Sequence, residues 1–273
     1  MERRRFLLFL AAGLAGTAVG RGTAGLVDPE RTPQPTAVPA AAAEPAPPAA
    51  PAPLPPVGVV DGLPGEGTSL ALTIDDGTDT DVVAAFCTFA TDTGVRLTFF
   101  PNGSYRSWET NGDLLQPLID SGQVAMGNHT WSHPDLTTLS DDQVAEEIGR
   151  NRDWLATTFG VRDTPFMRPP FGARNERIDR LSAEAGHPTI ALWNGTLEDH
   201  RMIGPEQLMD AARRWFTGQA IVVGHANQPT VTTVYDQLLA LLAERQLRTV
   251  TLADVWPTGL ARIGATVGRA AVA

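Results

Sequence analysis

The chain contains 273 residues, 42% of them hydrophobic and 19% charged, with a mean hydropathy of −0.09. These values exclude wholesale disorder and a polytopic membrane protein, and they predict a globular protein of one or two domains. Residues 58–273 contain 16 arginines, no lysine and 27 acidic residues, a net charge of −11. A domain with this charge repels phosphate backbones, so we expect no nucleic-acid partner.

Residues 1–24 have the pattern of an export signal. Three arginines, Arg3, Arg4 and Arg5, precede an apolar stretch from Phe6 to Gly20, which is the order of regions in a secretory signal peptide. The arginines followed by Phe-Leu also resemble a twin-arginine signal. The apolar stretch is shorter than the roughly 20 residues that a membrane span needs. We therefore predict a cleaved signal and no stable membrane span, with an uncleaved N-terminal anchor as the alternative.

Residues 25–57 are predicted to be a linker. The segment Pro29–Pro56 contains eleven of the 22 prolines, interleaved with alanine, a composition that favours extended polyproline II and cannot build a core. A disordered linker fits the same composition. Residues 58–257 would then form the catalytic domain and residues 258–273 a C-terminal tail. The all-arginine usage indicates a GC-rich bacterial source, and with the export signal it predicts a secreted or cell-surface protein.

From residue 69 onward, short β-rich runs alternate with longer helical patterns. The expected strands are Ser69–Asp75, Arg96–Pro101, Gln123–Gly127, Phe166–Arg168, Thr189–Trp193, Ala220–Gly224 and Arg248–Leu252. The expected helices are Thr80–Thr91, Asp113–Asp120, Ser140–Phe159, Asn175–Ala185, Pro205–Phe216 and Thr233–Arg245. Strands separated by helices in this way predict a parallel α/β domain.

Polar residues recur just after these strands, where α/β folds gather their functional groups. Asp75 and Asp76 end the first strand, and two adjacent carboxylates repel each other unless a cation or a guanidinium neutralises them. Gly77 allows the backbone to bend so that both side chains point into one site. A metal site is one interpretation of this segment, and a solvated Asp-Asp-Gly turn is the other.

His129 and His133 follow the third strand. Because they are four residues apart, they would lie on one side of a helical turn and could bind one ion. Two histidines and one aspartate, with an open position for water, form the ligand set of a hydrolytic zinc-type site. By contrast, His187 precedes a proline in a helix-to-strand loop and is interpreted as a solvated residue.

Three segments resemble, in order, the motifs of NodB-type polysaccharide deacetylases, carbohydrate esterase family 4. They are Thr73-Ile74-Asp75-Asp76-Gly77, His129-Thr130-Trp131-Ser132-His133 and Arg168-Pro169-Pro170-Phe171-Gly172. The resemblance implies that Asp75 is the base and that Arg168 holds it. It also implies that the Phe171 N–H stabilises the oxyanion, and that the metal ligands are Asp76, His129 and His133.

The last two motifs of the family match less closely. In the fourth, this sequence retains Trp193 and Asp199 but has His200 in place of the closing Trp; in the fifth it has Val223 before His225, where Leu is usual. The resemblance implies that His225 is the general acid, oriented by Asp199. It places Trp193 and Val223 at the substrate pocket, whose shape and acyl preference these replacements affect.

The resemblance implies a distorted (β/α) barrel of seven parallel strands. It also implies one divalent metal ion, with zinc as the expected ion and cobalt, nickel or manganese as alternatives. The activity would be hydrolysis of N-acetyl groups on a peptidoglycan or chitin-like polysaccharide. The alternatives are an O-acetyl esterase acting on xylan-type glycans and a non-catalytic glycan-binding homologue.

Overall fold

The computed structural model describes residues 54–257. The predicted export signal, the linker up to residue 53 and the C-terminal tail lie outside the described residues. The strands are β1 (Gly58–Val60), β2 (Ser69–Asp76), β3 (Leu97–Pro101), β4 (Val124–Met126), β5 (Phe166–Met167), β6 (Thr189–Ala191), β7 (Gly195–Thr196), β8 (Ala220–His225) and β9 (Arg248–Thr249). The helices are α1 (Thr80–Thr93), α2 (Ser107–Thr110), α3 (Gly112–Asp120), α4 (Asp141–Thr158), α5 (Glu176–Glu184), α6 (Pro205–Trp215), α7 (Tyr235–Glu244) and α8 (Leu252–Val255). Three short 3₁₀ turns span Leu136–Thr138, Pro170–Gly172 and Pro229–Thr233.

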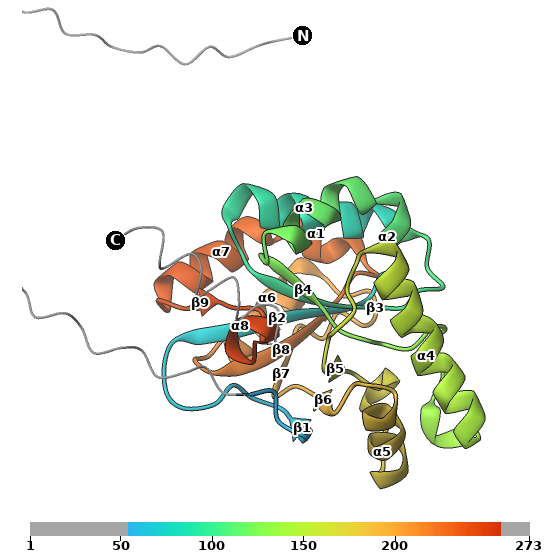
Figure 1. Ribbon diagram of the computed structural model, residues 1–273. Coiled ribbons are helices and arrows are strands. Elements are labelled where there is room, and N and C mark those ends of the chain that lie inside the picture. The colour runs from blue at the N-terminus through green and yellow to red at the C-terminus, as the bar shows by residue number, and fades with distance from the viewer. Residues whose placement is uncertain (1–53, 258–273) are drawn as a thin grey trace, which may run out of the picture. The chain divides into compact units, whose positions relative to one another are not determined.

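All strand pairs are parallel and fall into two sheets. The larger sheet has the order β4-β3-β2-β8-β7, with β9 also paired to β2, and the smaller has the order β1-β6-β5. The two sheets meet between β4 and β5, where Asn128 and Met167 form a single parallel bridge. Figure 1 shows β2, β3 and β8 at the centre, with α1, α3 and α7 on one side of them and α4 and α5 beside β4–β6.

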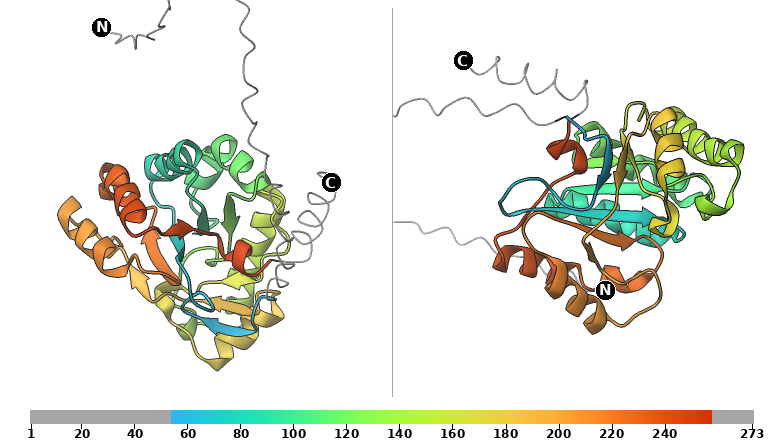
Figure 2. Two further views of the ribbon diagram at one scale, coloured as in Figure 1. Left: turned by 90° about the vertical axis from the view of Figure 1, so that its left-hand side faces the viewer. Right: turned by 90° about the horizontal axis from the view of Figure 1, so that it is seen from below.

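The predicted parallel α/β architecture is confirmed, and each of the seven expected strands is present. The described residues contain two further short strands, β1 and β7, and two further short helices, α2 and α8. The strands form two sheets that meet at a seam, and the described residues contain nine strands where the expected barrel has seven. Figure 2 shows the strands in the interior, with helices around much of the outside.

The helix boundaries follow from local chemistry. Helix α1 begins after Asp79, whose carboxylate accepts hydrogen bonds from two main-chain N–H groups of the first turn, and it ends at Gly94 in the left-handed region. Helix α4 begins with the predicted capping box, in which Ser140 and Gln143 bond each other's main-chain N–H. These caps fix where each helix starts relative to the strand end before it.

The main core lies between the large sheet and its helices. Strand β2 is buried along almost its whole length, and α1 packs Phe86 and Cys87 against it, both essentially inaccessible to solvent. Burial raises the pKa of the Cys87 thiol to about 12, which is typical of an unreactive core cysteine. The two carboxylates at the end of β2 are therefore mounted on a buried strand.

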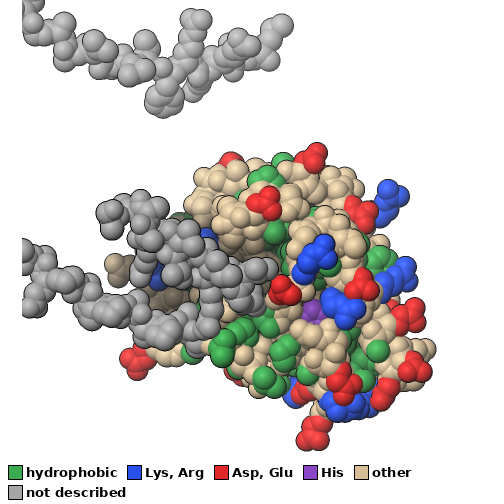
Figure 3. Space-filling model, viewed as in Figure 1, with side chains coloured by type: hydrophobic (Ala, Val, Ile, Leu, Met, Phe, Trp, Pro, Cys, Tyr) green, Lys and Arg blue, Asp and Glu red, His purple; other side chains and the backbone are tan. Residues whose placement is uncertain are grey.

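The surface is polar and mixed in charge. On the face shown in Figure 3, acidic and arginine side chains are interspersed. Among residues 54–257, no helix has both the length and the apolar character that a membrane crossing requires.

Candidate active site

The carboxyl end of β2 delivers two carboxylates to one pocket. Asp76 has a left-handed backbone (φ 68°) and Gly77 follows with φ 97°, so the chain turns sharply where the strand ends. The indole of Trp108 donates a hydrogen bond to the Asp76 carbonyl (2.7 Å). This turn brings Asp75 and Asp76 into the same pocket, although neighbouring side chains of a regular strand point to opposite faces.

Asp76, His129 and His133 converge as predicted. Asp76 Oδ1 lies 3.2 Å from Nε2 of His129 and 3.2 Å from Nε2 of His133, and this buried oxygen accepts no well-directed hydrogen bond. Burial alone would raise the pKa of Asp76, but the two imidazoles and His225 hold it well below its usual value. The three donor atoms lie within 4.8 Å of one another, which fits a small divalent cation.

The tautomer of His129 supports the same reading. Its Nδ1–H donates to the carbonyl oxygen of Arg168 (2.6 Å), because a carbonyl can only accept. A neutral His129 therefore points the lone pair of Nε2 at the carboxylate oxygen of Asp76. Two lone pairs facing each other at 3.2 Å repel unless a cation or a proton lies between them. Histidines that bind a metal through one ring nitrogen usually donate a hydrogen bond from the other, as His129 does to the Arg168 carbonyl.

The segment that carries the histidines is not helical, contrary to the prediction from their spacing. We call residues His129–His133 the ligand loop. Thr130 (φ 69°) and His133 (φ 64°) both adopt left-handed backbone conformations, each of which costs about 1–3 kcal/mol for a non-glycine residue. Contacts to the rest of the domain must hold this loop. One of them is Asn102, whose amide donates to the carbonyls of His129 (2.5 Å) and Thr130 (3.1 Å).

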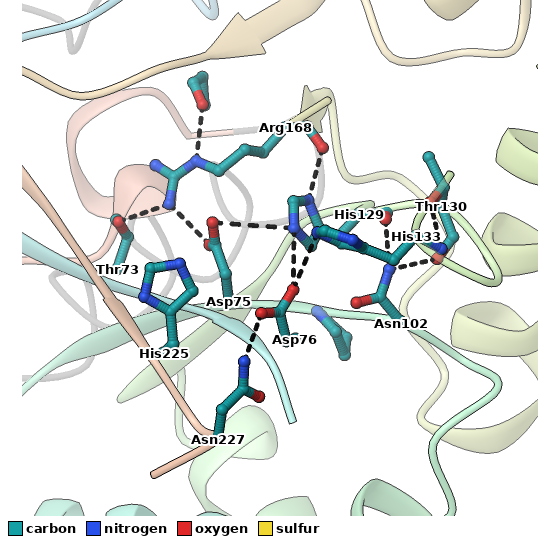
Figure 4. A network of polar contacts seen from close by, with 12 residues as sticks. Thr73, Asp75, Asp76, Asn102, His129, Thr130, His133, Arg168, His225 and Asn227 are labelled. Atoms are coloured by element: carbon teal, nitrogen blue, oxygen red, sulfur yellow. Dashed lines mark hydrogen bonds and ion pairs between the residues drawn. The ribbon is translucent and has the colours of Figure 1, made fainter. Parts of the chain in front are cut away.

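Asp75 is held by a buried guanidinium. Arg168 is fully buried, and its Nη1 donates to Asp75 Oδ1 (2.8 Å) and to the Thr73 hydroxyl (2.8 Å). Main-chain carbonyls of Ala191 and Leu192 accept its other N–H groups. The second oxygen of Asp75 lies 3.8 Å from Nε2 of His129 and faces the pocket. Figure 4 shows Asp75 between Arg168 and His129.

His225 and Asp199 form a second ion pair, after that of Arg168 with Asp75. His225 Nδ1 donates to Asp199 Oδ1 (2.9 Å), and the His225 main-chain N–H donates to the other oxygen (3.1 Å). Burial opposes protonation of His225, but the hydrogen bond and charge of Asp199, with Asp75 and Asp76 nearby, raise its pKa to about 9. Glu198, the acidic residue directly before Asp199, instead contacts Arg214 (3.2 Å) at the surface.

These groups line one open pocket of about 400 Å³. Asp75 and His225 lie opposite each other on the paired strands β2 and β8. Phe171 stands at the rim with 69% of its surface exposed. The predicted pocket residues Trp193 and Val223 are both in the lining, which comprises Asp75, Asp76, His129, His133, Pro169, Phe171, Trp193, Thr196, His200, Val223 and His225. The structure thus brings every predicted site residue to this pocket or into direct contact with a group that lines it.

Two residues that support the site were not predicted from the sequence, and a third was misassigned. Asn227 donates to the second oxygen of Asp76 (2.6 Å), and Asn102 holds the ligand loop. The one sequence signal that could have identified Asn227 is its position two residues after His225. His187 was interpreted as solvated, and that is wrong: it is 2% exposed and hydrogen-bonded to Asn128 (3.0 Å).

The profile of the family described as polysaccharide deacetylase matches residues 63–190. A peptidoglycan-N-acetylglucosamine deacetylase of Listeria monocytogenes is 28% identical over 226 residues, which cover 82% of this chain and 47% of the relative. The chain spans about half the length of the first curated relatives it matches.

Solved structures show the same fold. A peptidoglycan deacetylase of Bacillus subtilis superimposes with a TM-score of 0.61 at 24% identity, covering 74% of this chain and 96% of that one. A family 4 pseudoenzyme of Bacillus anthracis gives a TM-score of 0.64 at 19% identity, covering 72% and 68%. The structural neighbours thus include both a protein named as a deacetylase and a protein named as a pseudoenzyme.

Proposed function

This chain belongs to the polysaccharide deacetylase family, carbohydrate esterase family 4, and from that premise we propose that it is a metal-dependent hydrolase of N-acetyl groups on a cell-envelope or extracellular polysaccharide. The observation that carries the proposal is the convergence of two imidazoles on one unsatisfied carboxylate oxygen of Asp76. A candidate base and a candidate acid flank this centre on the paired strands β2 and β8.

Asp76, His129 and His133 would hold one divalent ion. Their set of two nitrogens and one oxygen suits zinc, with cobalt, nickel or manganese as substitutes. The bound ion would supply Lewis acidity, lowering the pKa of water and polarising the acetyl carbonyl. Asn227 orients the Asp76 carboxylate by occupying its second oxygen, which leaves Oδ1 for the ion.

Asp75 acts as the general base. Arg168 donates to one oxygen of Asp75 and is itself held by the Thr73 hydroxyl, so the other oxygen of Asp75 faces the pocket. From there it removes a proton from the attacking water as the water adds to the acetyl carbon. The main-chain N–H of Phe171 donates to the oxygen that becomes negative.

His225 acts as the general acid. An amine leaves the tetrahedral carbon only once it is protonated, and His225 remains protonated at neutral pH because its pKa is about 9. Asp199 keeps the proton donor turned toward the pocket by accepting from Nδ1, so Nε2–H is the proton that is transferred. Acetate and the free amine of the glycan are the products.

The substrate assignment rests on the pocket and on the relatives. The pocket opens at an exposed aromatic rim formed by Phe171, and aromatic rings suit the apolar faces of sugars. Relatives include peptidoglycan deacetylases and a chitin deacetylase. A peptidoglycan or chitin-like chain fits both facts, and export through the N-terminal segment would place the enzyme at that substrate.

A substrate panel tests the proposal. The metal-loaded full chain is assayed for acetate release from N-acetylglucosamine oligomers, peptidoglycan and acetylated xylan, beside His225→Ala. We expect wild-type activity on the N-acetylated glycans and a loss of at least about 100-fold in His225→Ala. Because an ester needs less help from an acid than an amide, O-acetyl hydrolysis should fall less in the variant.

The alternatives give different results in the same panel. An O-acetyl esterase would release acetate from xylan and none from the N-acetylated substrates. A non-catalytic glycan-binding protein would bind the glycans and release no acetate from any of them. The pseudoenzyme neighbour is likewise named as non-catalytic. The intact contacts of Asp75, His225 and the three metal-ligand residues favour the deacetylase.

A further inference from the structure

A chain of buried polar side chains lies behind the ligand loop and takes no part in the proposed chemistry. Asn128, Asn151 and His187 are all 0–2% exposed, and they come from the end of β4, from α4 and from the α5–β6 connection. Asn151 Nδ2 donates to Asn128 Oδ1 (3.1 Å), and Asn128 Nδ2 lies 3.0 Å from His187 Nε2. Buried polar groups of this kind stabilise one geometry only when all of them are satisfied.

His187 presents a fixed acceptor to Asn128. Its Nδ1–H donates to the Thr164 carbonyl (2.8 Å), which leaves Nε2 as the acceptor of the Asn128 amide. Burial, reinforced by the charge of Arg152 and only partly offset by the Thr164 carbonyl, lowers the pKa of His187 to about 4. Two hydrogen bonds between the main chain of His187 and Ser182 (2.9 and 2.8 Å) hold the backbone at His187.

Asn128 connects this acceptor to the ligand loop. Its amide makes all four hydrogen bonds open to it: Nδ2 donates to the Ile148 carbonyl (2.9 Å) and to His187, while Oδ1 accepts from Asn151 and from the main-chain N–H of Thr130 (2.9 Å). The bond to Thr130 holds the first left-handed residue of the loop. Asn128 is also the residue directly before His129.

We propose that His187 is a positioning residue of the metal centre, which acts through Asn128 to hold the ligand loop so that His129 and His133 both face Asp76. The inference rests on the proposed function, because it concerns the geometry of that ion site. Without an acceptor at the Nε2 position, one N–H of Asn128 would be buried and unpaired. The amide would then relax toward another partner and loosen its bond to Thr130.

Two substitutions separate this role from packing. In His187→Gln, the side-chain oxygen can reach the former Nε2 position and accept from Asn128. In His187→Asn, the shorter amide matches Nδ1 and can donate to the Thr164 carbonyl, but it offers Asn128 no acceptor. Both variants are polar and similar in volume, so they differ mainly in which of the two hydrogen bonds survives.

The test is a Co²⁺ titration of the metal-free full chain, followed by the visible absorption of the bound ion. Relative to wild type, we expect His187→Asn to raise the dissociation constant for Co²⁺ by about 10- to 100-fold and to alter the spectrum. The dissociation constant of His187→Gln should stay within about threefold of the wild-type value. Asn128→Ala, which removes the acceptor of the Thr130 N–H and leaves His187 in place, should weaken Co²⁺ binding to a similar degree.

Wild-type affinity in a folded His187→Asn, or in a folded Asn128→Ala, would overturn the inference. Equal weakening in His187→Gln and His187→Asn would also overturn it, because the loss would then come from altered packing. Melting temperatures of the metal-free proteins identify the folded variants. A wild-type chain that binds no Co²⁺ would overturn the proposed function and this inference together, whereas the other outcomes leave the proposed function standing.

Discussion

Two neighbouring carboxylates with different contacts are the clearest feature of the site at the scale of single residues. Asp75 is bound by Arg168 on one oxygen, whereas Asp76 faces two imidazoles on one oxygen and Asn227 on the other. Groups with such different surroundings take different roles, as pairs of catalytic carboxylates commonly do. The first predictions separate those roles.

Asp75→Asn should keep the ion and lose the reaction. The Asn side chain still accepts from Arg168, and the three proposed ligands are untouched, so metal content should equal that of wild type. The rate constant kcat should fall at least about 100-fold, the usual scale for a general base. Element analysis and acetate release on the same sample check both parts. In the matched variant Asp76→Asn, metal content itself should fall; unaltered turnover in Asp75→Asn would place the base elsewhere.

Asp199→Asn should move the alkaline limb of the kcat/KM profile. His225 must be protonated to act as an acid, so activity falls as the pH rises through its pKa, which is about 9 with Asp199 present. Removal of the charge lowers that pKa, and the alkaline limb should move to lower pH by about one unit. Glu198→Gln is the control, because Glu198 contacts Arg214 instead; a shift in this control with none in Asp199→Asn would reverse the assignment.

The proposed catalytic and metal-binding residues could be identified in the sequence because each lies near a strand end in a short local motif. The supporting residues were not, because their partners are distant in the sequence. Asn227 meets Asp76 across 151 positions and His187 meets Asn128 across 59. No local pattern distinguishes such a histidine from a solvated one, so its burial emerges only from the fold.

At the scale of elements, the end of β2 determines the site. The turn at the end of β2 requires glycine at position 77 for two reasons. The backbone has a positive φ there, and a Cβ on Gly77 would lie 2.2 Å from the Trp108 indole. The same indole bonds the Asp76 carbonyl. Any shift of Trp108 would therefore alter the position of a proposed metal ligand.

Gly77→Ala should destabilise the domain more than Gly94→Ala. Both glycines have positive φ, so each substitution introduces backbone strain of about 1 kcal/mol. Gly94 has open space around its Cβ position, whereas Gly77 meets Trp108, and the clash should add about 1–3 kcal/mol. Urea unfolding of both variants measures the difference in the free energy of unfolding. Equal losses would show that Trp108 moves aside freely.

The elements that were missed, β1, β7, α2 and α8, are all short, although the equally short β4, β5, β6 and β9 were predicted. The strands β2, β3 and β8 and the helices α1, α4 and α6 have enough residues to show a pattern and a cap. Strands β1 and β7 have three and two residues, too few for any alternation to appear. The helical reading of His129–His133 failed because spacing cannot distinguish a helical turn from a loop whose left-handed residues bring the same side chains together.

At the scale of the whole molecule, the site is assembled across the seam between the two sheets. The larger sheet supplies Asp75, Asp76 and His225, and the end of the smaller sheet supplies Arg168, whose carbonyl also orients His129. Arg168 bonds to Asp75 across this seam. The proposed base and one proposed metal ligand thus depend on the docking of one sheet against the other.

Export is the prediction that concerns the full chain. The apolar stretch Phe6–Gly20 should direct translocation, and cleavage should fall between about Ala18 and Ala24. N-terminal sequencing of protein recovered from the native envelope or medium checks this. An intact Met1 on envelope-bound protein would favour the anchor, and recovery from the cytoplasm alone would contradict export.

One ion held by Asp76, His129 and His133 is proposed to make this chain an amide hydrolase. The most direct measurement is acetate release from N-acetylglucosamine oligomers or peptidoglycan by the metal-stripped full chain as zinc is added back. We expect almost no release without zinc and a rise that saturates at about one ion per chain. Equal release by the stripped chain, or no release from either substrate at any zinc ratio, would contradict this proposal.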